Sequence, residues 1–107
     1  MLKELLSKGV TAFCCINDYV ALFVLQCLKS LDVNVPEQVS VTGFDNLDIS
    51  QMTYVPLTTV CQDMEKMGEI AARYVVDSIE KGKYSYMEKV VPVELVVRES
   101  CGKYEVY

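Results

Sequence analysis

The sequence predicts an α/β fold in which two parallel strands are joined by a buried helix. Two short runs of β-prone apolar residues, TAFCCI and VSVTG, have the length and composition of strands covered on both faces. The stretch between them is strongly apolar around most of a helical circumference, which is typical of a helix buried on more than one side. Since a strand, a helix and a second strand with short connections place the strands parallel, we expect a βαβ segment of a parallel sheet.

The first half of the chain supplies this unit in order. Leu2–Lys8 carries leucines on one side and predicts the end of a helix, which Gly9 stops. Thr11–Ile16 predicts the first strand. Asn17, or the first residue of the predicted helix Asp18–Leu31, can cap that helix by accepting a hydrogen bond from its N-terminal amides.

The second half begins with the other strand of the unit, Val39–Gly43, and a long loop follows it. Thr58–Cys61 predicts a short strand or crossover. Asp63–Lys81 is the clearest helix, because apolar residues recur at helical spacing and Gly82 stands at its end. The last run, Lys89–Val97, is rich in β-formers, and its proline places it at a sheet edge or bulge.

Composition narrows the function classes. Ten basic residues against fifteen acidic ones give a net charge of −5, so the chain should repel phosphate, and DNA binding would need another part of the protein. There is no histidine, the usual base of serine and cysteine catalysis and the commonest metal ligand. We therefore predict no catalytic residue, no metal and no cofactor. No apolar run has the length of a membrane span, and no signal-peptide pattern is present.

The five cysteines show no C-x-x-C spacing of a zinc or redox site. They are Cys14, Cys15, Cys27, Cys61 and Cys101. We predict that all five are buried or half-buried small apolar residues, which fits a reducing cytosol. A redox or acyl-transfer enzyme would need a basic neighbour to lower a thiol pKa, and no cysteine has one close in sequence.

Polar residues follow both strands of the predicted unit, where an open α/β sheet binds its ligands. Asn17 and Asp18 follow the first strand, and Phe44, Asp45 and Asn46 follow the second. Carboxylates and amides beside an aromatic face suit a neutral polyhydroxyl compound, whereas a phosphate would call for a glycine-rich loop or a basic cluster. Simpler interpretations remain, namely a helix cap, which spacing alone favours, and an ordinary turn after the second strand.

Several segments resemble, in the same order, motifs of the lactose-repressor/galactose-repressor family of transcription regulators. The matching segments are Ala12–Asp18 with Ala21, Val35–Asn46, Pro56–Val60 with Gln62, Gly68 with Ala71 and Ala72, and Pro92–Ser100. They cover nearly the whole chain and are specific together. The sequence departs from the family at Asp32, where a glycine usually ends the helix, at Gln38, which replaces an acidic residue, and at Asp63, which stands where proline is frequent.

The resemblance implies a truncated, periplasmic-binding-protein-like two-lobed domain that lacks the helix-turn-helix DNA-binding domain. Residues 1–57 would form the second half of the C-terminal lobe. Residues 58–107 would supply the crossover strand, a helix of the N-terminal lobe and the closing strand. The resemblance further implies that Asn17, Asp18 and Asp45 line the effector cleft and that Gln62 lies at the hinge. With Phe44, these are the five residues that we predict for the effector site.

A homodimer is also implied, with the predicted helix Asp18–Leu31 and the loop Asp48–Val55 at its interface. The expected interface residues are Leu22, Leu25, Met52, Thr53 and Tyr54. Because the helix is so apolar, we expect the chain to associate with itself, through this interface or by exchange of the Asp63–Lys81 helix or the closing strand.

We therefore expect the effector-sensing portion of a cytoplasmic regulator that responds to a sugar or sugar derivative. It would reach DNA only through an N-terminal domain outside this chain. The alternative is a periplasmic sugar-binding protein of a transport system. The VPEQVSV and PLTTV segments and the five cysteines favour the regulator.

Overall fold

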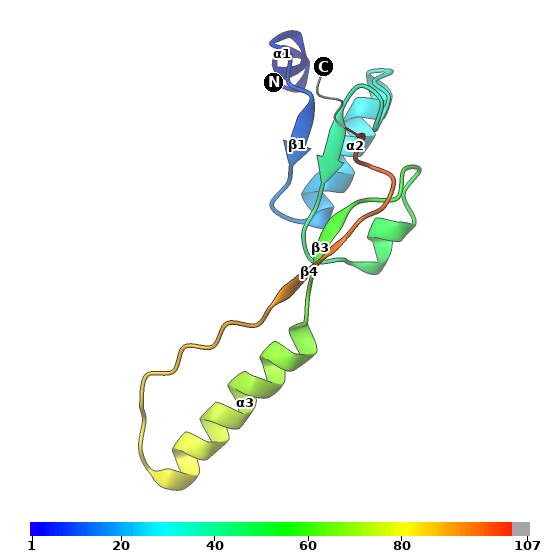
Figure 1. The fold of residues 1–107 in the computed structure, drawn as a ribbon. Coiled ribbons are helices and arrows are strands. Elements are labelled where there is room, and N and C mark those ends of the chain that lie inside the picture. Colours follow the sequence, from blue (N-terminus) through cyan, green and yellow to red (C-terminus); the bar gives the residue numbers. More distant parts are fainter. Residues whose placement is uncertain (104–107) are drawn as a thin grey trace. The chain divides into compact units, whose positions relative to one another are not determined.

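The computed structural model describes residues 1–103. Its elements, in chain order, are α1 (Leu2–Ser7), β1 (Ala12–Cys14), α2 (Asp18–Ser30), β2 (Ser40–Thr42), the 3₁₀ helix η1 (Asp48–Gln51), β3 (Thr59–Gln62), α3 (Met64–Lys81) and β4 (Val93–Val96) (Figure 1). They form two compact units. Residues 1–61 and 95–103 make the first unit, and residues 62–94 make the second.

The predicted βαβ segment is confirmed. β1 and β2 pair in parallel, with Ala12 opposite Ser40 and Cys14 opposite Thr42, and α2 connects them. A parallel bridge between Thr42 and Thr58 continues the pairing towards β3, and β3 and β4 form a second two-stranded sheet.

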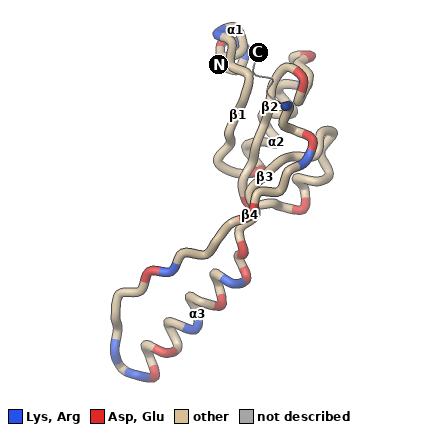
Figure 2. Tube along the Cα trace, viewed as in Figure 1, with Lys and Arg blue, Asp and Glu red and all other residues tan. Residues whose placement is uncertain are grey.

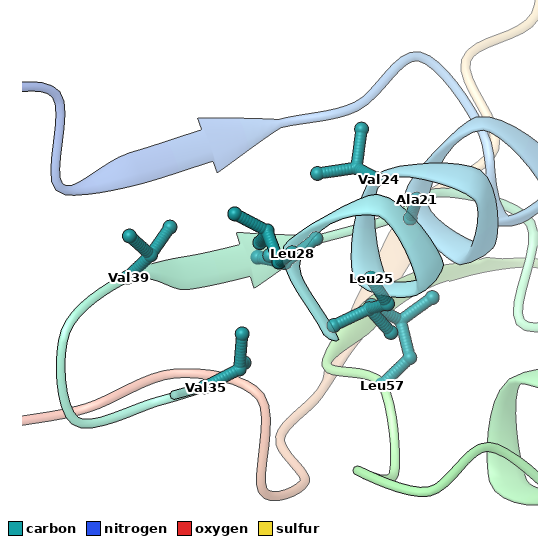
Figure 3. Close-up of a cluster of buried hydrophobic side chains, with 8 residues drawn as sticks. Ala21, Val24, Leu25, Leu28, Val35, Val39 and Leu57 are labelled. Carbon is teal, nitrogen blue, oxygen red and sulfur yellow. The ribbon is translucent and has the colours of Figure 1, made fainter. Parts of the chain in front are cut away.

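The core of the first unit lies between one face of α2 and the strand segments (Figure 3). Its buried side chains are Ala21, Val24, Leu25, Leu28, Val35, Val39, Val41 and Leu57. The four that α2 contributes follow the spacing i, i+3, i+4, i+7, which is one face of a helix. The apolar residues of α2 therefore build the core through a single stripe.

The opposite side of α2 differs from the prediction of burial on more than one side. Val20 is 42% exposed and Phe23 is 69% exposed. Phe23 lines a cavity of about 370 Å³ together with Met1 and Leu2 of the N-terminal segment. Within the residues that the structure describes, only one face of this helix is packed, which is why its remaining apolar residues stay accessible.

β1 is also more exposed than predicted. Ala12 and Cys14 are exposed and Phe13 is half-buried, because in the described residues β1 pairs only with β2 and forms a sheet edge. The prediction that all five cysteines are buried or half-buried is thus wrong for Cys14. The other four are half-buried.

Local signals at the helix ends act as predicted. The Asn17 side chain accepts a hydrogen bond from the Val20 amide at 2.9 Å and caps α2. α3 ends at Gly82 in the left-handed conformation. α2 ends in the same way at Asp32, whose φ is 54°, although an aspartate carries a Cβ that disfavours this region.

The second unit consists mainly of α3 and the extended segment that follows it. Figure 2 shows acidic and basic residues distributed along α3, and exposed i, i+4 ion pairs join Arg73 to Glu69 and Lys81 to Asp77. The Tyr74 hydroxyl donates to the Ser85 carbonyl, which holds the extended segment along the helix. No helix in residues 1–103 is long and apolar enough to cross a membrane.

Candidate functional site

The structure brings the carboxyl ends of β1 and β2 together, as the predicted site requires. The Asp18 amide donates to the Phe44 carbonyl at 2.9 Å, which joins the start of α2 to the residues after β2. Asn17, Phe44 and Asp45 are each half-buried at this edge. Four of the five residues predicted for the effector site therefore share one edge of the first unit.

Asp18 is the most buried residue of this group, with no exposed surface. Its Oδ2 accepts a hydrogen bond from the Leu47 amide at 2.8 Å, and its Oδ1 accepts one from the Thr59 hydroxyl at 2.5 Å. The carboxylate also lies at the N-terminus of α2, where the helix dipole favours negative charge. Asp18 thus joins the start of α2 to the loop after β2 and to β3, and both oxygens of its carboxylate accept hydrogen bonds from the protein.

Gly43 makes room for this carboxylate. A Cβ placed at this glycine would overlap Asp18 Oδ1 and would lie 2.8 Å from Leu57 Cδ2. A side chain there would displace a buried charged group, so the close approach of β2 to the start of α2 requires glycine.

Asp45 lies in a turn with an unusual backbone. Its φ is 103° and that of Asn46 is 53°, both in the region that favours glycine. The Asp45 amide donates to the Val60 carbonyl at 2.8 Å, and the Asn46 amide donates to the Thr59 hydroxyl oxygen at 3.4 Å. The turn is therefore fixed by its neighbours, and strained backbone of this kind often marks a functional position.

Gln62, the fifth residue predicted for the effector site, is the last residue of β3. It is half-buried and belongs to the second unit. Phe44, which the sequence offered as an aromatic face, contributes its backbone carbonyl to the hydrogen bond with Asp18.

Sequence reasoning missed three polar residues that support this edge. The Ser100 hydroxyl donates to the Val41 carbonyl at 2.6 Å and accepts from the Thr58 amide at 2.8 Å. Thr59 and Arg98 hydrogen-bond the turn after β2. Their partners lie 13 to 59 residues away in sequence, so no local pattern indicates these roles.

The residues predicted for a dimer interface fall into different environments. Met52 is 81% exposed, and Leu22 and Thr53 are half-buried. Tyr54 is exposed in part and donates its hydroxyl proton to the Leu25 carbonyl at 2.9 Å. Leu25 is 1% exposed and belongs to the core. Its side chain is therefore not accessible to a second chain, which differs from the prediction for this residue.

Comparison with known proteins agrees with this architecture. Residues 2–101 match the family model of the periplasmic binding protein-like domain. The HTH-type transcriptional regulator MalR of Streptomyces coelicolor is 36% identical over 94% of this chain and 29% of its own length. The regulator DegA of Bacillus subtilis is 38% identical over 94% of this chain and 30% of its own length.

Solved structures give the same result. A LacI family transcriptional regulator from Enterococcus faecium with bound ribose has a TM-score of 0.83 and 29% identity, covering 92% of this chain and 37% of that one. The CelR–cellobiose complex has a TM-score of 0.85 and 34% identity, covering 92% and 31%. The lac repressor dimer bound to operator and an anti-inducer has a TM-score of 0.79 and 27% identity, covering 92% and 35%.

The chain therefore belongs to the periplasmic-binding-protein-like domain family. Within that family it is a portion of the effector-binding domain of lactose-repressor/galactose-repressor regulators. It spans about 30% of the length of the curated relatives named above. Those relatives are transcription regulators rather than enzymes, which agrees with the prediction that the chain has no catalytic role.

Proposed function

We propose that this chain is part of the sensing domain of a transcription regulator whose effector is a sugar or a sugar derivative. The observation that carries the proposal is the turn after β2, which holds Asp45 half-buried next to Phe44, at the edge where Asn17 also lies. A carboxylate, an amide and an aromatic ring can together bind a neutral polyhydroxyl compound. Structural neighbours bound to ribose and to cellobiose support the same ligand class.

The residues of this edge have different proposed roles. Asp45 is the proposed polar anchor of the effector, Phe44 offers an apolar surface, and Asn17 caps α2 while standing at the same edge. Asp18 acts by holding the edge in shape, because it is buried and accepts hydrogen bonds from the protein itself. Gln62 is proposed as an effector contact from the family resemblance.

The proposed mechanism is allosteric. An effector can shift an equilibrium between two states of the domain only by the difference between its affinities for those states. We assign residues 1–57 to the C-terminal lobe and the α3 segment to the N-terminal lobe of the full domain. This chain has a net charge of −5, which disfavours contact with the phosphates of DNA. We therefore assign DNA binding, in the cytoplasm, to a separate N-terminal domain.

The test is the substitution Asp45→Asn in the native protein that contains this chain. Losing a hydrogen bond to a charged group typically costs about 1.5–3 kcal/mol, so affinity should fall by about tenfold or more. Isothermal titration calorimetry with ribose, cellobiose and a panel of other mono- and disaccharides measures this. Asp48→Asn, at an exposed position of η1, is the matched control and should leave affinity unchanged. Unchanged affinity in Asp45→Asn, or binding of no sugar by the unmutated protein, would contradict the proposal.

A homodimer is the proposed assembly, as in the lac repressor dimer that this chain resembles. The accessible part of the predicted interface comprises Met52, Tyr54 and the half-buried Leu22 and Thr53. A contiguous patch of exposed apolar side chains often marks a protein–protein interface, and these residues are proposed to contribute to one. Sedimentation velocity across a wide dilution range checks the assembly, and a single monomeric species throughout would contradict it.

A further inference from the structure

Arg98, which follows β4 in the first unit, holds the segment between β2 and β3 with its guanidinium group. One terminal nitrogen, Nη1, donates to the Ser50 hydroxyl oxygen at 2.8 Å and to the Leu57 carbonyl at 2.7 Å. The other, Nη2, donates to the Asn46 side-chain oxygen at 2.6 Å. The three acceptors are neutral and come from different parts of one segment.

The backbone of this arginine is itself fixed. Its amide donates to the Thr58 hydroxyl oxygen at 2.9 Å, and the next amide, that of Glu99, donates to the Pro56 carbonyl at 2.9 Å. The guanidinium group therefore projects from a backbone segment that is held by hydrogen bonds. It reaches the turn that carries Asp45 through the adjacent residue, Asn46.

That turn needs external support. Asp45 and Asn46 have positive φ angles in succession, and non-glycine residues keep such a conformation only where the surroundings hold it. Contacts from the core side come from Val60 and Thr59, to which the two amides donate. The contact of Arg98 with the Asn46 side chain adds a further tie from the C-terminal segment.

We infer that Arg98 is a positioning residue that clamps the turn after β2 in the conformation that presents Asp45. The inference rests on the proposed function for the role of Asp45, but the clamp itself is defined without any ligand. A planar guanidinium fork can serve three acceptors at fixed angles, whereas a lysine ammonium is a point charge on a flexible stem. The three hydrogen bonds of the clamp therefore depend on the shape of the arginine side chain more than on its charge.

The test is Arg98→Lys, which keeps the charge and removes the fork. Hydrogen–deuterium exchange read by mass spectrometry on a peptide covering residues 43–51 reports the turn directly. We expect this peptide to exchange about tenfold faster in the variant, because its amides open locally. A peptide covering residues 19–30, within α2, should be unchanged. Arg73→Lys, at an exposed ion pair on α3, is the matched control and should change neither peptide.

Unchanged exchange of residues 43–51 in Arg98→Lys would overturn the inference, and so would an equal acceleration of both peptides, which would indicate a general loss of stability. Because exchange requires no ligand, either result leaves the proposed function standing. Conversely, an unmutated protein that binds no sugar would refute the proposed function and leave the clamp intact. Where ribose or cellobiose binds, Arg98→Lys should weaken that binding, and an unchanged affinity would also overturn the positioning role.

Discussion

The buried carboxylate of Asp18 should contribute more to stability than any surface charge of this chain. It accepts hydrogen bonds from the Leu47 amide and the Thr59 hydroxyl, and hydrogen bonds to charged groups contribute about 1.5–3 kcal/mol each. Asp18→Ala removes both and should lower the free energy of unfolding by about 3–6 kcal/mol. This is a large fraction of the total stability of a small domain, about 5–15 kcal/mol.

Asp18→Asn should cost less, about 2 kcal/mol, because an amide can still accept from Leu47 and donate to the Thr59 oxygen, but without charge. Urea unfolding followed by circular dichroism measures both variants, with Asp77→Ala on α3 as the control. Asp77 belongs to an exposed ion pair, and such pairs contribute at most about 1 kcal/mol.

A double-mutant cycle isolates the contact between the two side chains. Thr59→Val removes the hydroxyl at nearly constant volume, and its effect should not add to that of Asp18→Ala. The coupling free energy should fall within about 0.5–3 kcal/mol, as is usual for residues in direct contact. A loss below about 1 kcal/mol in Asp18→Ala, or strict additivity in the cycle, would show that the carboxylate does not tie these segments together.

Two further predictions concern single positions. Asp32→Gly should raise the free energy of unfolding by about 1 kcal/mol, since the left-handed conformation that ends α2 disfavours a Cβ. Urea unfolding checks this, and Asp32→Ala, which keeps the Cβ, should give no such gain. In the folded protein Cys14 should react with iodoacetamide before Cys15, because Cys14 is exposed while burial, followed by the neighbouring Cys14, raises the pKa of the Cys15 thiol. Mass spectrometry of partially alkylated protein measures the order, and equal rates would contradict the assignment.

The elements of the fold were predictable because their signals are local. The apolar stripe of α2, the cap at Asn17 and the glycine at position 82 each act within a few residues. Parallel pairing of β1 and β2 followed from the short connections of the βαβ unit. The prediction failed for burial at Cys14 and Phe23, which are exposed because β1 forms a sheet edge and α2 packs through one face in the described residues.

The candidate site was predictable only in outline. Strand order and the rule for parallel sheets indicated which edge carries Asp18 and Asp45. The sequence could not tell the buried carboxylate from the half-buried one, because that difference depends on Thr59, 41 residues beyond Asp18. The same holds for Arg98, whose three acceptors lie 41 to 52 residues before it.

Asp18 and Asp45 differ in burial, and this difference separates effects on stability from effects on effector binding. Asp18 has no exposed surface, so an effector could reach it only after the contacts with Leu47 and Thr59 open. Asp45 is half-buried, and its backbone amide donates to the Val60 carbonyl, so Asp45 is more accessible to a ligand than Asp18 is. Substitutions at Asp18 should therefore lower stability, and any loss of affinity should follow from that loss of stability. Substitutions at Asp45 should lower affinity more than they lower stability, and the two measurements together separate the supporting carboxylate from the binding one.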